Sequence, residues 1–286
     1  MRALFFTLFF CAGLEAFGQT VDQQDDPQKT QEAQRSVLEV KPGAEVIKDK
    51  DLWEKTGYFH PFRRMPKYIL ADQKNIWTSP FHIHSRDLKI VVPLVLATGA
   101  AIATDKTTLR DVISLDPAFN NDNTNASNAM IGGFIAAPAL LYGIGHFRGN
   151  EHARETGLLG AEALVDGVVV EQGMKLIFWR ERPYQDAGRG RFFQSSVGVD
   201  SSFPSSHSVL AFASAAVIAG EYRNPWTQVL VYGGAAGISF TRLMGQQHFP
   251  SDVLVGSAVG WLVGHYVYKH RHRFEPAHDH AHPVSR

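Results

Sequence analysis

The sequence predicts an all-α protein built as a helical bundle. Six apolar segments are longer than typical strands and are rich in Ala, Gly and Leu. They also lack the alternation of apolar and polar residues that a half-buried strand shows, which favours helices. We therefore predict six helices, at residues 90–104, 129–145, 157–179, 208–220, 229–240 and 253–268.

The amino terminus has the pattern of a secretory signal peptide. Arg2 precedes an apolar core at 3–14, and small residues follow this core. We predict a signal peptide at 1–18, which directs the chain to the cell envelope. The one cysteine, Cys11, lies inside this segment, so the exported chain would hold no disulfide.

The segments that flank the bundle differ from it in composition. Residues 19–52 are rich in Gln, Asp and Lys and poor in aromatic residues, which predicts a flexible leader. In 53–87 aromatic and basic residues mix, and we predict an amphipathic lead-in helix that lies on an apolar surface. Its apolar face comprises Ile69, Leu70, Ile76 and Trp77. We assign the bundle to 88–268 and a disordered tail to the His-rich residues 269–286, for which transition-metal binding is the alternative.

Membrane embedding is favoured over a soluble bundle, although most apolar runs are shorter than the ~20 residues that a bilayer span needs. A stripe of small residues at Gly256, Gly260 and Gly264 permits close helix contact in either setting. The positive-inside rule places the Arg- and Lys-rich face of the bundle in the cytoplasm, whereas six full spans after a cleaved signal peptide would place the functional face there. A bundle that does not fully span the membrane, or one crossing more or fewer, removes this conflict. We expect an exported protein, periplasmic or membrane-associated, whose functional face is extracytoplasmic. The net charge of zero gives no reason to expect a nucleic-acid partner.

Three clusters of chemically active residues stand at predicted helix boundaries. They read Lys175-LIFWRE-Arg182-Pro183, then Pro204-Ser205-Ser206-His207, then Thr241-Arg242-LMGQQ-His248-FPS-Asp252. If consecutive helices run up and down, as short connections favour, these boundaries meet at one end of the bundle. We therefore expect the three clusters to form one site.

The residue types in these clusters suit phosphate chemistry. Lys175, Arg182 and Arg242 supply cationic donors, and the start of the helix after Ser205 adds a positive dipole end. Together they predict an oxyanion site, most simply for phosphate. Two histidines can then divide the work of phosphoryl transfer, since one attacks and the other protonates the departing oxygen.

His248 suits the nucleophile, because Asp252 four residues on can bind one ring nitrogen and leave the other free. His207 has no acidic neighbour in the sequence, which suits a proton donor. No cluster has metal-ligand spacing, so we expect a mechanism without a metal or other cofactor. The acidic residues of the third predicted helix are interpreted as a polar stripe between packed helices and are left outside the site. They are Glu162, Asp166 and Glu171.

The pattern K-x6-RP, PS-x-H and R-x5-H-x3-D resembles the signature of the type 2 phosphatidic acid phosphatase and vanadium haloperoxidase superfamily. The resemblance covers about residues 88–268, including the helix pattern, and implies a six-helix bundle of that kind. It implies that His248 forms a phosphohistidine, that Asp252 orients His248, and that His207 is the general acid.

The resemblance also implies which residues hold the phosphate oxygens. These are Lys175, Arg182, Ser205, Ser206 and Arg242. Two positions depart from the family pattern. Ser206 replaces the usual glycine before the histidine and keeps its N–H, and Thr241 replaces the usual serine and keeps a hydroxyl.

The leading interpretation is a metal-independent phosphatase that hydrolyses phosphate monoesters or pyrophosphates. Lipid-linked substrates, such as phosphatidic acid-type lipids or prenyl pyrophosphates, are favoured because apolar helices surround the site. A soluble periplasmic acid phosphatase would share all three clusters. A vanadate-dependent haloperoxidase is a further alternative, since vanadate mimics the phosphoryl transition state; in a phosphatase it would inhibit. The last alternative is an envelope scaffold with an idle site, which Ser206 in place of glycine would fit.

Overall fold

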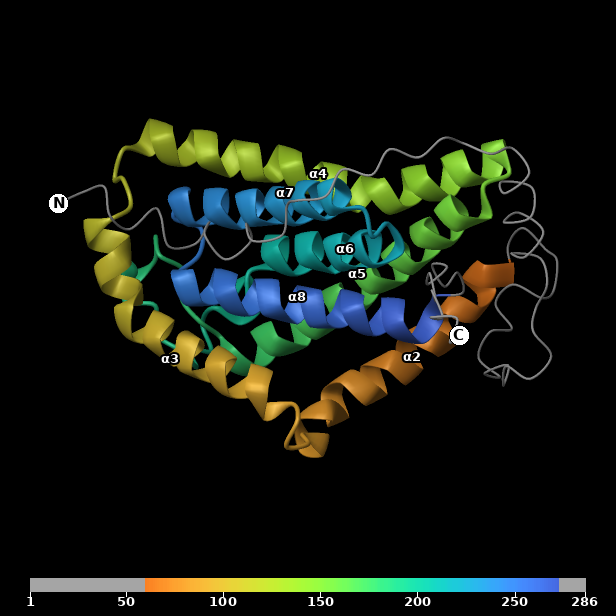
Figure 1. Ribbon diagram of the computed structural model, residues 1–286. Helices are drawn as coiled ribbons and strands as arrows, with labels where there is room; N and C mark the ends of the chain where they lie inside the picture. Colours follow the sequence, from red (N-terminus) through yellow and green to blue (C-terminus); the bar gives the residue numbers. More distant parts are fainter. Residues whose placement is uncertain (1–59, 273–286) are drawn as a thin grey trace, which may run out of the picture. The chain divides into compact units, whose positions relative to one another are not determined.

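The computed structural model describes residues 60–272, so the predicted signal peptide, the leader and residues 273–286 of the tail lie outside the described residues. Within 60–272 the chain is all-α, with seven α-helices and no strand (Figure 1). The helices are α2 His60–Thr78, α3 Leu88–Asp111, α4 Pro117–Arg148, α5 Glu151–Phe178, α6 Ser206–Glu221, α7 Pro225–Met244 and α8 Pro250–Arg271. All of them belong to one unit of the chain, residues 48–286.

Each of the six predicted helices is present, but each extends beyond its apolar run. The extension is largest for α4, which begins at Pro117 because the Asp116 side chain accepts a hydrogen bond from the Ala118 N–H. This helix ends at Gly149, whose φ of 65° is the left-handed conformation that terminates helices. Asn150 then caps α5, so residues 149–150 alone connect two helices that pack against each other.

The bundle consists of α4 to α8, and α3 takes a smaller part in it than predicted. Figure 1 shows α2 and α3 as two arms on the outside of the other helices. α3 packs mainly against α8 and buries only Asp105 and Leu109. Of the six predicted helices, five therefore pack closely together and α3 lies on their outside, while α2 is a seventh helix.

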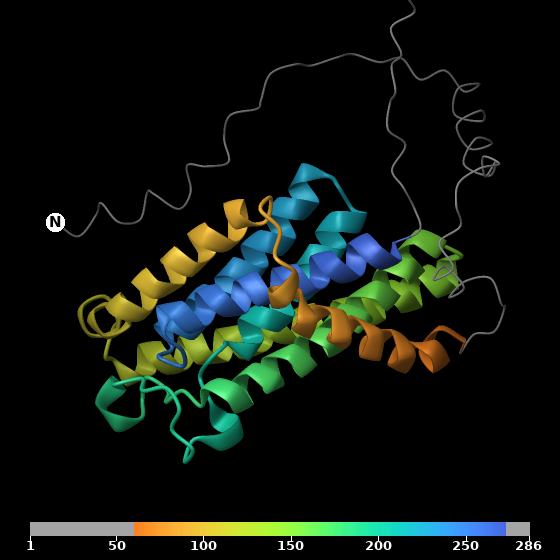
Figure 2. The ribbon, with the colours of Figure 1, turned by 90° about the horizontal axis from the view of Figure 1, so that it is seen from below.

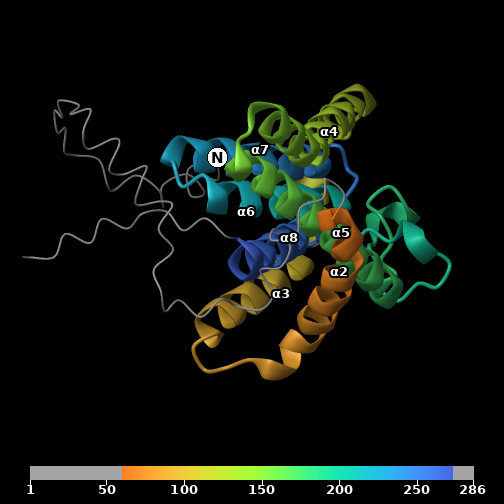
Figure 3. The same cartoon turned by 90° about the vertical axis from the view of Figure 1, so that its right-hand side faces the viewer.

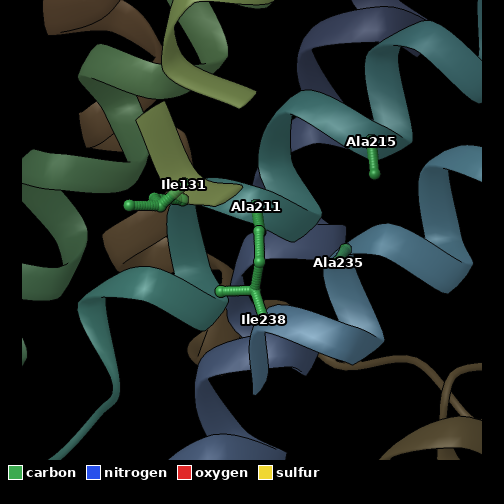
Figure 4. Packing of buried hydrophobic residues seen from close by; sticks show 5 residues of the cluster. All are labelled: Ile131, Ala211, Ala215, Ala235 and Ile238. Atoms are coloured by element: carbon green, nitrogen blue, oxygen red, sulfur yellow. The ribbon is translucent and has the colours of Figure 1, made fainter. Parts of the chain in front are cut away.

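Small residues let the central helices approach closely. Figure 4 shows one part of the core, formed by Ile131, Ala211, Ala215, Ala235 and Ile238 from α4, α6 and α7.

The glycine stripe of α8 faces α6. A Cβ added at Gly260 would lie 2.2 Å from the carbonyl oxygen of Val209, so only glycine permits this contact. The close approach aligns the starts of the two helices, where the Ser205 N–H donates to the Asp252 carbonyl at 3.0 Å.

The lead-in helix α2 buries only part of the face that was predicted, since Ile69 and Ile76 are half-buried on it. Tyr68 and Asp72 are buried, whereas Leu70 is 72% exposed. The buried face includes a carboxylate because Arg271 of α8 pairs with Asp72 at 2.6 Å. Hydropathy alone misses Asp72 on this face, since it does not register an ion pair made to a distant helix.

Two described helices, α3 and α4, are long and apolar enough to cross a membrane. Only 6% of the apolar stretch of α3 and 17% of that of α4 is buried, whereas the core helix of a soluble protein would be mostly buried. The exposed apolar side chains of α3 include Ile90, Val92, Val95, Leu96 and Ile102. Apolar surface of this extent indicates association with a membrane.

Candidate active site

The three sequence clusters meet at one end of the bundle. Figure 2 shows the connection between α5 and α6, residues 179–205, looping out at the end where α8 begins. Lys175 Nζ lies 2.7 Å from Ser206 Oγ, which joins the first cluster to the second. Arg182 Nη1 donates to the Gln247 carbonyl at 3.3 Å, which joins the first cluster to the third.

His248 lies in the turn between α7 and α8 and is almost completely buried. Its Nδ1 lies 2.8 Å from the Ser202 carbonyl oxygen, which can only accept, so Nδ1 carries the proton. Nε2 then holds the lone pair that a nucleophile needs, and among residues 60–272 it has no hydrogen-bond partner. Burial, followed by the charges of Arg182 and Arg242, lowers the pKa of His248 well below its usual value, so the ring is neutral.

Asp252 does not bind His248 in the predicted way. Its Oδ2 is 3.7 Å from His248 Nδ1, which is too long for a hydrogen bond. Oδ2 instead accepts the Phe249 N–H at 2.8 Å and closes the first turn of α8. Burial raises the pKa of Asp252 to about 6, while its ion pair with Arg180 opposes this rise. The Ser202 carbonyl thus fixes the tautomer, and Asp252 holds the turn that carries the histidine.

Arg180 is a residue of this site that the sequence analysis missed. The buried guanidinium bridges two carboxylates, with Nη1 2.5 Å from Asp252 and Nη2 2.6 Å from Asp105 of α3. Asp105 also accepts the Ser251 N–H at 3.0 Å. The network ties α3 to the start of α8, because a planar guanidinium holds both carboxylates in fixed positions. A third cation between positions 175 and 182 is the one local signal that could have indicated it.

His207 stands in the first turn of α6 and shares a partner with Arg242. Its Nε2 lies 3.0 Å from Asn128 Oδ1, and Arg242 Nη1 lies 3.3 Å from the same oxygen. Asn128 was not predicted because it precedes the apolar part of α4. Burial, followed by the charge of Arg242, lowers the pKa of His207 to about 3. The free protein therefore holds His207 in its neutral form.

Among the predicted site residues, two buried polar atoms have no hydrogen-bond partner in the described part of the chain. They are Ser205 Oγ and Arg242 Nε. Ser205 is the N-cap residue of α6, but its side chain makes no capping bond. Burial lowers the pKa of Arg242 to about 10, so it stays charged near neutral pH. A buried polar group without a partner costs about 1–3 kcal/mol, so an acceptor such as a phosphate oxygen would stabilise both atoms.

The side chains of Lys175 and Ser206 are both held by Glu171, which the sequence analysis left outside the site. Lys175 Nζ lies 2.7 Å from Glu171 Oε1, and Ser206 Oγ donates to the same carboxylate. Glu171 therefore borders the site, which corrects its assignment to a purely structural stripe. The Lys175 ammonium keeps a third donor, and Ser206 keeps its N–H in the first turn of α6, where helix N–H groups have no intrahelical acceptor.

Arg182 reaches the site from a loop rather than from a helix. α5 ends at Phe178 because Trp179 adopts a left-handed conformation with φ 37°, so Lys175 and Arg182 do not lie on one helix. Arg182 Nε pairs with Asp200 at 3.0 Å. Of the three predicted cations it is the most accessible, with 11% of its side chain exposed.

The fold and the site together define a helical protein that can hold a phosphate-like anion beside two histidines. Residues 156–275, less than half of the chain, match the family model described as the PAP2 superfamily. The matched region runs from α5 through α8 and contains every site residue that the sequence analysis named.

One relative gives a more particular likeness. Over 65 residues the chain is 45% identical to the lipid A 1-phosphatase of Porphyromonas gingivalis. The aligned segment is 22% of this chain and only 15% of that relative's length. No solved structure matches the chain.

Proposed function

We propose that this protein is a phosphatase that hydrolyses a phosphate monoester or pyrophosphate on a lipid through a phosphohistidine at His248. The observation that carries the proposal is the pair of unpartnered buried donors, Ser205 Oγ and Arg242 Nε, at the same end of the bundle as His248. A bound phosphate supplies acceptors for both, and the nearby cations offset its charge.

In the first half of the reaction, His248 Nε2 attacks phosphorus, and the bond from phosphorus to the leaving oxygen breaks. His207 in its protonated form gives a proton to that oxygen. The developing charge on the phosphoryl oxygens is stabilised by Arg182, Arg242 and the N–H groups at the start of α6.

In the second half a water molecule attacks the phosphohistidine, and neutral His207 takes a proton from it. The phosphorus–nitrogen bond breaks, which releases phosphate and restores His248. His207 must therefore gain a proton before the first step. A bound phosphate dianion favours this, because it offsets the cations that lower the pKa of His207 in the free protein.

The lipid nature of the substrate rests on α3 and α4. Their exposed apolar surfaces would hold the site end of the bundle close to a membrane. The relative named a lipid A 1-phosphatase is consistent with a phosphate on a lipid. We interpret α3 to α8 as the six helices that the family resemblance implies, with the active site on the extracytoplasmic side.

The test measures phosphate release in EDTA from phosphatidic acid, phosphatidylglycerol phosphate, undecaprenyl pyrophosphate, lipid A and p-nitrophenyl phosphate. We expect the wild type to act on a lipid substrate and His248→Ala to be inactive, with vanadate as an inhibitor. Preference for p-nitrophenyl phosphate over every lipid would instead support a soluble acid phosphatase. Folded wild-type protein that releases no phosphate, but oxidises halide when vanadate and peroxide are added, would support a haloperoxidase.

A further inference from the structure

A second buried cluster of charges lies away from the phosphate site, where α2, α5 and α8 meet. Asp72 of α2, Glu162 and Asp166 of α5, and Arg271 of α8 form it, and the three carboxylates are at most 2% exposed. Figure 3 shows α2 running across α5, with α8 beside them. Arg271 binds Asp72 at 2.6 Å and Glu162 at 3.2 Å.

The charges of this cluster do not balance. Three carboxylates face one guanidinium, which leaves an excess of two negative charges when all are ionised. The other polar side chains beside the cluster are neutral, since Gln73 Nε2 donates to Asp166 Oδ1 at 2.8 Å and Tyr266 lies close to Asp72.

The geometry of the carboxylates suits a cation. One oxygen from each of the three lies within 4.8 Å of the others. Asp72 Oδ2 and Asp166 Oδ2 are buried and have no hydrogen-bond partner in the described part of the chain. Ca²⁺ binds carboxylate oxygens at about 2.3–2.6 Å, so oxygens around one ion are separated by up to about 5 Å.

We propose that Asp72, Glu162 and Asp166 bind one Ca²⁺-like divalent cation that fixes α2 against α5 and α8. A charge of +2 would neutralise the excess of the cluster. The donor set contains only oxygen, which favours Ca²⁺ over Zn²⁺, and Ca²⁺ accepts irregular protein cages more readily than Mg²⁺ does. The site takes no part in phosphoryl transfer, so the proposal does not depend on the proposed function.

The experiment titrates Ca²⁺ into the full chain after EDTA treatment and dialysis, by calorimetry. We expect one site per chain in the wild type, and at least about tenfold weaker binding in Glu162→Gln and Asp166→Asn, which each remove one ligand charge. Glu151→Gln is the matched control, because Glu151 lies on the same helix, is 48% exposed and pairs with Arg154. It should bind Ca²⁺ as the wild type does.

Two results would overturn the proposal. One is a wild-type protein that binds no Ca²⁺ at millimolar concentrations, in which case the cluster is neutralised by protons. The other is Glu162→Gln binding as tightly as the wild type, which would place the ion elsewhere. If the carboxylate variants do not fold, amide exchange of the wild type decides: Ca²⁺ should slow exchange in α2 and leave residues 179–205 unchanged. Equal exchange in α2 with and without Ca²⁺ would also refute the site.

Discussion

α5 carries two buried charged clusters with opposite imbalances. Near its C-terminal end Lys175 joins Arg182 and Arg242, and the cations outnumber the buried carboxylate of Glu171. In its middle Glu162 and Asp166 join Asp72, and the anions outnumber Arg271. Uncompensated charge is costly to bury, and each imbalance is the reason why we propose a ligand of opposite sign. The comparison teaches that the sign of the excess charge, rather than the number of ion pairs, distinguishes the proposed phosphate site from the proposed cation site.

The largest effect is expected for replacing Arg180. Its charge is already balanced by the carboxylates of Asp105 and Asp252, so we expect it to stabilise the fold rather than to bind a ligand. Arg180→Ala leaves Asp105 and Asp252 buried without their cation, which should lower the free energy of unfolding by about 3–5 kcal/mol. Denaturant unfolding followed by circular dichroism measures this. Arg110→Ala, which removes an exposed pair with Asp111, serves as the control and should unfold with the wild type. Equal midpoints for Arg180→Ala and the control would show that the buried network contributes nothing.

Arg242→Ala should reduce the activity strongly, whereas a change in the acidic cluster of α5 should not. It removes a buried donor aimed at the phosphate, so kcat/KM for phosphate release should fall by about 10²–10³-fold. Glu162→Gln changes only the acidic cluster in the middle of α5, away from the reacting groups. Its kcat/KM should stay within about threefold of the wild type, which corresponds to a change of less than about 1 kcal/mol in the activation free energy. Similar losses in both variants would mean that the two clusters act as one site.

The pH dependence of the rate should show the effect of ligand charge on His207. His207 acts in its protonated form, so the rate falls as pH rises through its pKa. That pKa is lowered to about 3 in the free protein, first by burial and then by the cations, and a bound dianion should raise it. The alkaline limb of kcat should therefore lie about one pH unit or more above that of kcat/KM. If the alkaline limbs of kcat and kcat/KM coincided, the pKa of His207 would not be lowered by the neighbouring cations in the free protein.

The smallest effect is expected for Ser206→Gly, which restores the residue usual in the family. Lys175 keeps its ion pair with Glu171 when the Ser206 hydroxyl is removed, and the backbone N–H remains. Phosphate release should therefore change by no more than about threefold. A tenfold change in either direction would mean that the hydroxyl sets the position of Lys175.

The sequence could predict those features that depend on local signals. Helix ends carry recognisable residues, and helices of alternating direction bring them together, which is why Lys175, Ser205, His207, Arg242 and His248 could be grouped from their positions along the chain. The apolar periodicity located all six predicted helices but placed the start of α4 too late, because its first turns are polar. Asn128, which contacts both His207 and Arg242, was missed for that reason.

Other features depend on contacts that leave no local trace. The partner of His248 is a backbone carbonyl, at Ser202, and any residue type would supply that oxygen. Arg180 and Asp105 are 75 positions apart, and their pairing requires α3 to lie against α8. Glu162 and Asp166 show helical spacing, but Asp72 joins them only through the crossing of α2 over α5.

The C-terminal turn of α8 determines where the chain can be shortened. Hydropathy places the end of the bundle at residue 268, yet the helix continues to Arg271, whose side chain is only 7% exposed. Cutting the chain after Tyr268 would remove the guanidinium that pairs with Asp72 and Glu162 and would release one end of α2. A recombinant protein shortened for crystallisation should therefore keep residue 272, and a purification tag at the C-terminus belongs beyond it.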